Sequence, residues 1–292
     1  MSIIWDSTSL KEIANAKSNR KWKATGLEID SRKVKRGDLF CAIKGSNLDG
    51  HNYIKGAMKN GAAACLVSNN NPALNEIAFA KVNSVIKTIE KMAIEARRRS
   101  KAKFVAITGS VGKTGTKDMF RTSFSKVTDI FASQSSFNNH IGVPVSLSQI
   151  PESALFCVLE VGMNKKGEIK KLSELIKPDL AIITAVEQSH LQGLKDLRNI
   201  ALAKSEILNS LSKYGCFIFN KDTNFSQMLN DKAIKLKINN IISYGISDCA
   251  NIKLINFKLN NNVYFIKANC FEKIIEWEMP AIGEHWIYNS LS

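Results

Sequence analysis

The chain has 292 residues, enough for two domains of ordinary size, and its 45% hydrophobic and 23% charged residues exclude a disordered or fibrous protein. No apolar run approaches the roughly 20 residues that cross a bilayer, and the N-terminus lacks a basic start, so we expect neither membrane insertion nor a signal peptide. The lysines behind the net charge of +15 are spread along the chain without interleaved aromatic residues, which favours small polyanionic ligands over nucleic acid.

Residues 1–100 alternate between short strand and helix patterns and are expected to form a small α/β domain. Asp6 or Ser7 can cap a first helix that continues through Ala16. A polar loop at 44–51 precedes the second helix, and the segment 99–103 is the expected linker to the next domain. The other predicted elements are strands at 24–29, 38–43, 63–67 and 77–82, and helices near 52–60 and 84–99.

From residue 101 to 292 we expect a second domain with a mostly parallel sheet. Its strands, such as 180–186, are continuously apolar, which is typical of a parallel sheet covered on both faces. Such an open α/β fold binds ligands at the carboxyl ends of its strands. After residue 250 the alternation around 260–262 predicts an antiparallel hairpin or meander. The predicted strands are 104–107, 128–132, 155–161, 180–186, 215–220 and 241–245, and the helices lie near 114–125, 142–149, 167–176, 196–212 and 223–231.

The stretch 104–116 carries the motif around which the second domain is organised. An apolar strand runs into a glycine-bearing turn and then a helix pattern, with the spacing G-x-x-G-K-T from Gly109 to Thr114. Backbone N–H groups of such a turn can bind phosphate, Lys113 can neutralise it, and the Thr114 hydroxyl can hold Mg²⁺. The motif therefore predicts a nucleotide site in a P-loop ATPase-like domain, and an ordinary strand–helix turn is the alternative.

Further polar residues follow the ends of other predicted strands. Glu160 ends the third central strand, His190 follows the fourth, and Lys204 lies in the next helix. The pair Asn138–Asn139 lies in the loop after the second strand. Thr114 and Glu160 offer hard oxygen ligands of the kind that Mg²⁺ prefers. Taken one at a time, these residues have ordinary readings as a helix cap, a packed histidine and a solvated lysine.

The six cysteines lack a C-x-x-C pair and are expected to be reduced. Several of them lie in apolar runs, where a free thiol behaves as a small buried side chain. Reduced, buried thiols are typical of a cytoplasmic protein, which is the expected location. The cysteines in apolar runs are Cys41, Cys65, Cys157 and Cys216.

Taken together, the motifs occur in an order that resembles the Mur ligases over essentially the whole chain. In the first hundred residues, the strings 30–32, 36–40 and 48–51 are similar to that family's UDP-sugar-binding domain. The strings Phe-Asn-Asn-x-Ile-Gly-Val-Pro and Gly-Met-Asn…Gly-Glu-Ile are similar to the branch of the family that adds a dipeptide. The matching segments of the second domain are 107–114, 137–144, 159–169, 190–191 and 203–207.

The resemblance implies an ATP-dependent, ADP-forming ligase of peptidoglycan synthesis, and hence of cell-wall growth, cell shape and division. The implied reaction joins D-alanyl-D-alanine to a UDP-N-acetylmuramoyl tripeptide through an acyl phosphate, with ATP and Mg²⁺ as cofactors. A sibling ligase for another amino acid, including the folylpolyglutamate type, and a nucleotide-binding module without ligase activity are the alternatives. We expect a monomer.

The resemblance also assigns roles to individual residues. Lys113, His190 and Lys204 are the implied catalytic residues, and Lys204 matches a lysine that family members carry as a carbamate. The implied metal ligands are Thr114, Glu160, His190 and Lys204. The implied nucleotide-binding residues are Gly109, Ser110, Val111, Gly112, Lys113, Thr114, Gly115 and Asn289. The implied substrate-binding residues are Ser31, Arg32, Asp49, His51, Asn138 and Asn139.

The chain departs from the family pattern in three residues and at its end. Gly115 replaces a commoner threonine, Val111 a commoner asparagine, and Trp286 stands where a smaller residue is common. Family members continue into a Rossmann-like third domain, whereas this sequence stops at Ser292, as a fragment or a truncated product. We therefore expect weak ligand binding, poor ligation and a frayed end around Asn289.

Overall fold

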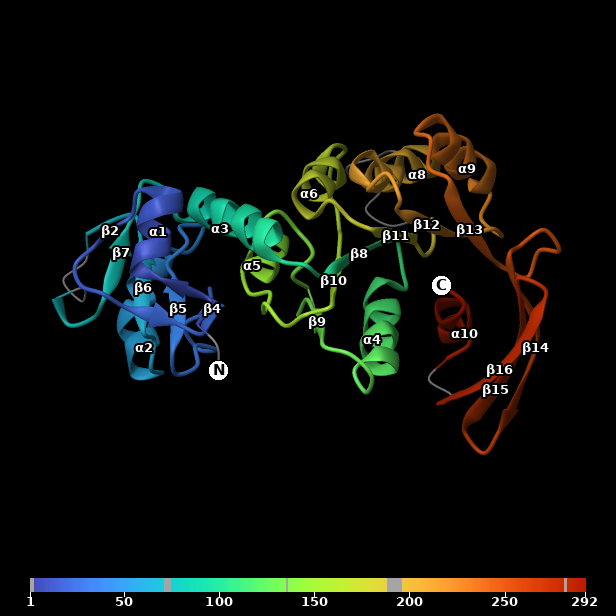
Figure 1. Cartoon of the computed structure of the whole chain (residues 1–292), viewed down its shortest axis with the longest axis horizontal. Coiled ribbons are helices and arrows are strands. Elements are labelled where there is room, and N and C mark those ends of the chain that lie inside the picture. The colour runs from blue at the N-terminus through green and yellow to red at the C-terminus, as the bar shows by residue number, and fades with distance from the viewer. Residues whose placement is uncertain (1–2, 71–74, 135, 188–195, 281–282) are drawn as a thin grey trace. The chain divides into compact units, whose positions relative to one another are not determined.

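The computed structural model describes residues 3–70, 75–134, 136–187, 196–280 and 283–292, and they fall into two compact units (Figure 1). The first unit comprises residues 1–101 and 144–154, and the second comprises residues 102–143 and 155–292. The division at 101/102 lies within the expected linker. The segment 144–154, however, clusters with the first unit, although the sequence pattern assigns it to the second domain.

The first unit is built on a five-stranded sheet with the order β2-β7-β6-β5-β4. Strands β4 to β7 are parallel, and β2 runs antiparallel to β7. A separate ribbon pairs β1 with β3. The predicted helices and strands are present within a few residues, whereas the two-residue strands β1 and β2 were not predicted. The elements of this unit are β1 (Trp5–Asp6), α1 (Ser7–Ala14), β2 (Lys17–Ser18), β3 (Lys23–Ala24), β4 (Gly26–Glu28), β5 (Asp38–Cys41), η1 (Gly50–Tyr53), α2 (Ile54–Lys59), β6 (Ala64–Val67), β7 (Phe79–Lys81) and α3 (Val85–Arg99).

A buried tryptophan explains why the segment 144–154 belongs to the first unit. The Trp5 ring is 1% exposed, and its indole nitrogen donates to the Ser148 carbonyl at 2.7 Å. The Ser148 hydroxyl in turn lies 3.3 Å from the carbonyl of Ile89 in α3. The guanidinium carbon of Arg99 lies 4.4 Å from the Trp5 ring centroid, a cation–π contact. These contacts join parts of the sequence that no local pattern connects.

The second unit is built on a nine-stranded sheet with the order β16-β15-β14-β13-β12-β11-β8-β10-β9. Strands β8 to β14 are parallel, and β14, β15 and β16 form the predicted antiparallel meander. The mixed α/β fold with parallel sheets is thus as predicted. The helix α5 (Gly142–Leu147) begins in this unit and continues into the segment 144–154 of the first unit. The other elements are β8 (Lys103–Thr108), α4 (Lys113–Phe124), β9 (Ile130–Ala132), β10 (Phe156–Glu160), α6 (Glu168–Ile176), β11 (Leu180–Ile183), α8 (Leu197–Lys204), η3 (Ser205–Ser210), β12 (Cys216–Asn220), α9 (Ser226–Lys235), β13 (Asn240–Gly245), β14 (Ile252–Asn260), β15 (Val263–Cys270), β16 (Lys273–Pro280) and α10 (His285–Ser290).

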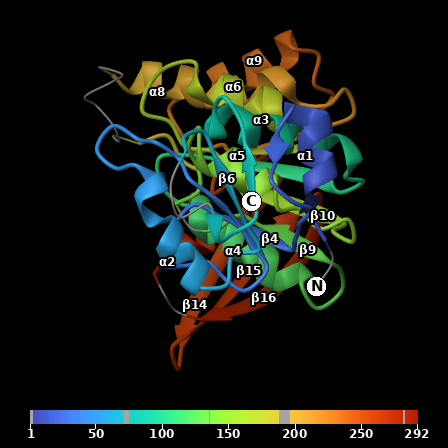
Figure 2. The same cartoon turned by 90° about the vertical axis from the view of Figure 1, so that its left-hand side faces the viewer.

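Helices cover this sheet on two sides. In Figure 1 the helices α6, α8 and α9 lie above the sheet, and α4 and α10 lie below it. In Figure 2 the helices α6, α8 and α9 again lie above α4. The central strands are buried as their apolar sequences predict, with Val105, Ile107, Val158 and Ile182 in one cluster. The carboxyl ends of β8 and β10 therefore meet at one edge, where the polar residues of the motifs emerge.

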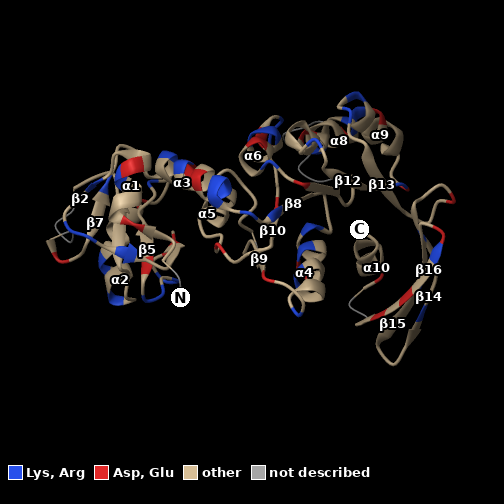
Figure 3. Cartoon of the chain, viewed as in Figure 1, with Lys and Arg blue, Asp and Glu red and all other residues tan. Residues whose placement is uncertain are grey.

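Basic residues are distributed over both units. Figure 3 shows lysines and arginines on α2, α3, α4, α6 and α9, interspersed with acidic residues. The basic end of α3, Arg97–Arg99, lies in the last turn of that helix, where cations suit the helix dipole. No helix within the described ranges has the length and apolar character needed to cross a membrane.

Candidate functional site

The turn between β8 and α4 requires glycine at two positions. A Cβ atom on Gly109 would stand 1.9 Å from Thr184 Oγ1, a buried hydroxyl that donates to the Val111 carbonyl at 2.5 Å. Gly112, the N-terminal cap of α4, has a φ of +87°, which side chains disfavour. The backbone can therefore follow a tight path that leaves the first N–H groups of α4 without helical partners, as an anion site requires.

Lys113 is the first residue of α4 and folds back over the turn. Its Nζ atom donates to the carbonyls of Gly109, at 2.7 Å, and Ser110, at 3.3 Å. Burial lowers the pKa of the Lys113 ammonium, while the Glu160 carboxylate acts in the opposite direction. Its cationic head group thus lies on the glycine turn, bonded to the turn's own carbonyls.

The Glu160 side chain lies at the end of β10 and is 1% exposed. Its Oε2 accepts a hydrogen bond from the Thr114 hydroxyl at 3.1 Å. Its Oε1 lies 3.2 Å from the Lys117 ammonium, an ion pair whose angles do not meet those of a hydrogen bond. With Oε1 beside the Lys117 ammonium, the carboxylate presents Oε2 next to the Thr114 hydroxyl. These two oxygens suit a Mg²⁺ ion, which takes few protein ligands and keeps its waters. Within the described ranges, no three His, Cys, Asp or Glu side chains cluster as a metal site.

Lys204 ends α8 and is also buried, with 2% of its surface exposed. Burial lowers the pKa of its amine to about 7, and the positive charge of Lys113 adds to the effect. The two ammonium groups therefore lie within electrostatic range of each other. At neutral pH, a substantial part of the Lys204 population carries an uncharged amine.

The two asparagines after β9 take different positions. The carbonyl of Asn138 accepts from Gly162 N at 2.7 Å, and the Asn138 side chain would lie 3.0 Å from a Cβ on Gly162. Asn138 thus lies just beyond β10, near Glu160. The Asn139 side-chain oxygen instead accepts from the N–H groups of Ile141 and Gly142, so it caps the start of α5.

The last helix, α10, packs against the start of α4. Asn289 lies within α10 and is 9% exposed. Its side-chain oxygen would lie 2.5 Å from a Cβ on Gly112, and its amide nitrogen 3.1 Å from a Cβ on Gly115. The Trp286 ring would lie 3.2 Å from that same Gly115 Cβ. Two of the departures from the family pattern, Gly115 and Trp286, are therefore in contact, and the missing side chain accommodates the larger ring.

This contact predicts a coupling between the two residues. Because alanine favours a helix over glycine by about 1 kcal/mol, Gly115→Ala should stabilise the protein only when the ring is removed. We expect Gly115→Ala to be neutral or destabilising alone, and stabilising in a Trp286→Ala background, with a coupling of about 1 kcal/mol. Guanidinium unfolding of the unsubstituted chain, the two single variants and the double variant measures the coupling. If the changes in the free energy of unfolding caused by the two substitutions simply add, Gly115 does not compensate for the Trp286 ring.

The residues predicted to bind the UDP sugar lie in the first unit. Arg32 forms a two-point contact with Asp30, at 2.9 and 2.8 Å, which lowers the pKa of that carboxyl to about 2. Ser31 lies between them and accepts from the Asn60 amide through its carbonyl. The Arg32 side chain is 86% exposed, so its guanidinium is accessible to a ligand.

His51 is buried rather than open. Its Nδ1 lies 2.6 Å from Asp49 Oδ1, and its Nε2 accepts the backbone N–H of Ser68 at 3.0 Å. Asp49 also accepts the backbone N–H of His51. The aspartate and the histidine therefore hold the polar loop against the end of β6, which is a structural role.

Of the residues predicted to converge on one triphosphate, the structure brings Lys113, Thr114 and Glu160 together and places Lys204 within electrostatic range of Lys113. Lys113 and Thr114 come from the turn, Glu160 from the next strand and Lys204 from α8. His190 lies outside the described residues. Ser110 exchanges hydrogen bonds with the backbone of Glu187, at 2.8 and 3.0 Å, so its hydroxyl fastens the turn to the segment after β11.

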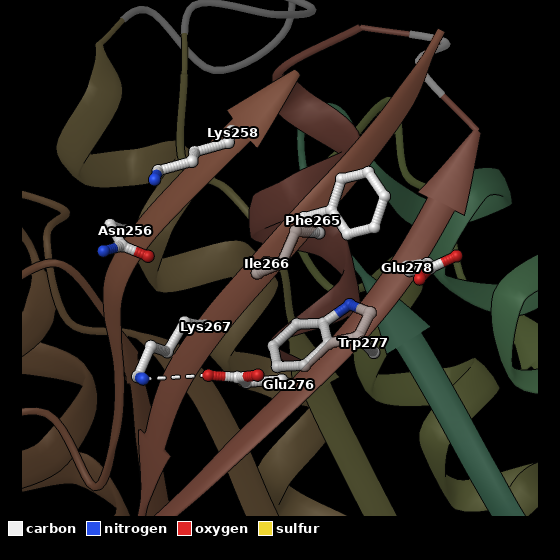
Figure 4. Close-up of a pocket in the computed structure, with 8 residues that line it drawn as sticks. All are labelled: Asn256, Lys258, Phe265, Ile266, Lys267, Glu276, Trp277 and Glu278. Carbon is white, nitrogen blue, oxygen red and sulfur yellow. Dashed lines mark ion pairs between the residues drawn. The ribbon is translucent and has the colours of Figure 1, made fainter. Parts of the chain in front are cut away.

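Two hollows of the second unit lie away from these four side chains. A shallow one of about 380 Å³ on the meander is drawn in Figure 4, where Lys267 points toward Glu276 at 2.8 Å. A larger one of about 920 Å³, mostly apolar, lies along α4 and reaches Trp286 and Asn289. The meander hollow contains none of the predicted site residues.

Lys117 and Ser133 belong to the site but are not part of the predicted motif. Lys117 donates to the Ser133 carbonyl at 2.8 Å in addition to its ion pair with Glu160. Lys117 follows Lys113 by four residues and therefore lies on the same face of α4. This spacing is the feature of the sequence that could have indicated a role for Lys117 in the site. Ser133 has no comparable signal, because its role depends on the neighbouring strand.

The comparisons with known proteins cover nearly the whole chain. Residues 107–292 match the Mur ligase middle domain, and residues 23–105 match the Mur ligase family, catalytic domain. A UDP-N-acetylmuramoyl-tripeptide–D-alanyl-D-alanine ligase of Rickettsia prowazekii is 34% identical over 98% of this chain and 64% of its own length. A protein of the same name from Bacillus subtilis is 37% identical over 66% of this chain and 43% of its own length.

A solved structure has the same fold. The crystal structure of MurF from Acinetobacter baumannii superposes with a TM-score of 0.83 at 25% identity, covering 98% of this chain and 63% of that one. The chain thus spans 64% of the length of the Rickettsia relative.

Proposed function

Because the chain belongs to the Mur ligase family, we propose that it is part of an ATP-dependent ligase that joins D-alanyl-D-alanine to a UDP-N-acetylmuramoyl tripeptide in peptidoglycan synthesis. Residues 1–100 would bind the UDP sugar, with Ser31 and Arg32 as contacts. Residues 101–292 would bind ATP. Relatives that carry this name match almost the whole chain, which supports the assignment.

The observation that carries the proposal is the cluster of Lys113, Thr114, Glu160 and Lys204 at one edge of the sheet. The turn 109–115 would surround the phosphates of ATP, with the Lys113 ammonium moving from the turn carbonyls to the terminal phosphate oxygens. Asn289, which packs on the turn, would contact the adenine. Asn138 would lie toward the acyl substrate.

The proposed ligation has two steps. The terminal carboxylate of the tripeptide attacks the γ-phosphorus of ATP, giving an acyl phosphate and ADP. The amine of D-alanyl-D-alanine then attacks the acyl carbon, and phosphate and a proton leave. Lys113 would offset the charge on the transferred phosphoryl group. When bound, two Mg²⁺ ions would further neutralise the phosphate charge. Thr114 and Glu160 would hold one ion, His190 would help to hold the second, and the carbamate of Lys204 would supply an anionic oxygen ligand.

Lys204 has the properties that carbamate formation needs. Only an uncharged amine adds to CO₂, a reaction that forms an N–C bond and releases one proton. With a pKa lowered to about 7 by burial, Lys204 supplies that amine at neutral pH. The product carries a negative charge beside Lys113, which replaces a repulsion by an attraction. A lysine here would thereby become an oxygen ligand.

The same burial predicts how stability depends on pH. The unfolded lysine, with its ordinary value of 10.5, binds a proton between pH 7 and 10.5 where the folded one does not, so the free energy of unfolding should rise across this window. At pH 6 and without bicarbonate, Lys204→Met should therefore be more stable than the unsubstituted chain by roughly 2–4 kcal/mol. Guanidinium unfolding at pH 6, 8 and 10 measures the difference. A difference that stays constant across this range would contradict the burial of an amine here.

Thermal protection tests the proposed function. We expect ATP with Mg²⁺ to raise the melting temperature, and UDP-N-acetylmuramoyl tripeptide to raise it more than the corresponding dipeptide or monopeptide. Protection by a shorter muramyl peptide would point to a sibling ligase. Protection by ATP with Mg²⁺ but by none of the muramyl peptides would favour a nucleotide-binding module. The absence of protection by every one of these ligands would contradict the proposal.

A further inference from the structure

Lys117 lies on α4 one turn after Thr114 and is 2% exposed, although lysine is rarely buried without a partner. Its ammonium nitrogen lies 2.8 Å from the Ser133 carbonyl and 3.2 Å from Glu160 Oε1. A third oxygen, Asp118 Oδ1, is 3.5 Å away and belongs to a partly exposed side chain. The motif does not require a lysine here, so its burial needs a separate explanation.

The ion pair divides the two oxygens of the Glu160 carboxylate. Oε1 faces Lys117, and Oε2 accepts the Thr114 hydroxyl hydrogen at 3.1 Å. The last torsion of a glutamate side chain has broad, shallow minima, so the carboxylate plane is fixed only by its partners. With a cation on one oxygen, the other is directed toward Thr114 and the start of the glycine turn.

Contacts with Ser133 fix the position of the Lys117 ammonium. The Ser133 N–H donates to the Val158 carbonyl at 3.0 Å, which fixes the residue beside β10. Its hydroxyl lies 3.4 Å from the backbone nitrogen of Glu160, from which it accepts a hydrogen bond. Lys117, Ser133 and Glu160 thus form a closed set of contacts between α4 and the ends of β9 and β10.

We infer that Lys117 is a positioning residue, which through Glu160 Oε1 keeps Glu160 Oε2 turned toward the place where Thr114 meets the metal of a bound nucleotide. The inference rests on the proposed function for the identity of that ligand. Lys117 does not touch the nucleotide itself. Its loss should therefore weaken the contribution of Mg²⁺ to nucleotide binding and spare the binding that does not depend on Mg²⁺.

Calorimetric titration of the 292-residue chain with a non-hydrolysable ATP analogue, in Mg²⁺ and in EDTA, tests this. The readout is the ratio of the two affinities. We expect Lys117→Met to reduce this ratio at least tenfold while changing the affinity in EDTA less than threefold. The matched control is Lys126→Met, at an exposed lysine just beyond α4, which should leave both affinities unchanged. An unchanged ratio in Lys117→Met, with normal binding by the unsubstituted chain, would overturn this inference alone.

A second comparison remains informative where Lys117→Met does not fold, because Lys117→Met/Glu160→Gln leaves no unpaired charge. If Lys117 acts only through the carboxylate, this double variant and Glu160→Gln should bind the analogue within threefold of each other in both conditions. A further tenfold loss in the double variant would show direct contact with the nucleotide and overturn the inference. If the unsubstituted chain binds no nucleotide in either condition, the proposed nucleotide site fails, and the inference fails with it.

Discussion

Replacing Lys113 by methionine is expected to lower the affinity for ATP at least about 100-fold, because two charge-assisted hydrogen bonds to phosphate are each worth roughly 1.5–3 kcal/mol. The Lys113 ammonium contacts the carbonyls of Gly109 and Ser110. Methionine preserves the length of the side chain and removes its charge. Titration with ATP and Mg²⁺ measures the change.

The fold should survive this substitution. Burial disfavours the charged form of Lys113, so an apolar side chain of similar length should not destabilise the second unit. Lys171→Met, at an exposed position of α6, is the matched control and should bind ATP normally. A folded Lys113→Met protein with an ATP affinity within threefold of the original would contradict the assignment of the turn as a phosphate site.

Substituting alanine for Gly109 is expected to damage both binding and stability. The new Cβ would stand 1.9 Å from Thr184 Oγ1, a hydroxyl fixed by its bond to the Val111 carbonyl. Neither group can move without displacing the turn, and such overpacking costs typically about 1–3 kcal/mol. We expect unfolding at lower guanidinium concentration and at least a tenfold loss of ATP affinity.

A second glycine-to-alanine substitution, at a position with room for a Cβ atom, is the matched control for Gly109→Ala. A Cβ on Gly45, in the polar loop of the first unit, would have its closest contact at 3.4 Å, with the Leu48 carbonyl. Gly45→Ala should leave both stability and ATP affinity nearly unchanged. Equal behaviour of the two variants would contradict the close approach at Gly109.

Much of the fold follows from local pattern. The strand of residues 180–183 is apolar throughout and is central, and the alternation around 260–262 becomes the turn of the β14–β15 hairpin. Asp6 caps α1 as predicted. These features depend on residues close in sequence. The membership of 144–154 in the first unit could not be predicted, because it depends on the tertiary contact between Trp5 and Ser148.

In the candidate site, too, some features follow from local sequence and others depend on tertiary contacts. Lys113 and Thr114 are given by their spacing in the turn, and the resemblance to the Mur ligases, which the comparisons confirm, adds Glu160 and Lys204. The contact between Gly115 and Trp286 could not be predicted from the sequence, because the two residues are 171 positions apart (286 − 115). His51 was predicted as a ligand contact, but its buried bonds to Asp49 and Ser68 also give it a structural role.

A crystal structure of the chain with a non-hydrolysable ATP analogue and Mg²⁺ tests most directly whether the clustered side chains form one triphosphate site. We predict terminal phosphates against the turn 109–115 and the Lys113 ammonium, with the metal beside Thr114 and Glu160. An analogue bound elsewhere, with Lys113 still folded onto the carbonyls of its own turn, would contradict the account.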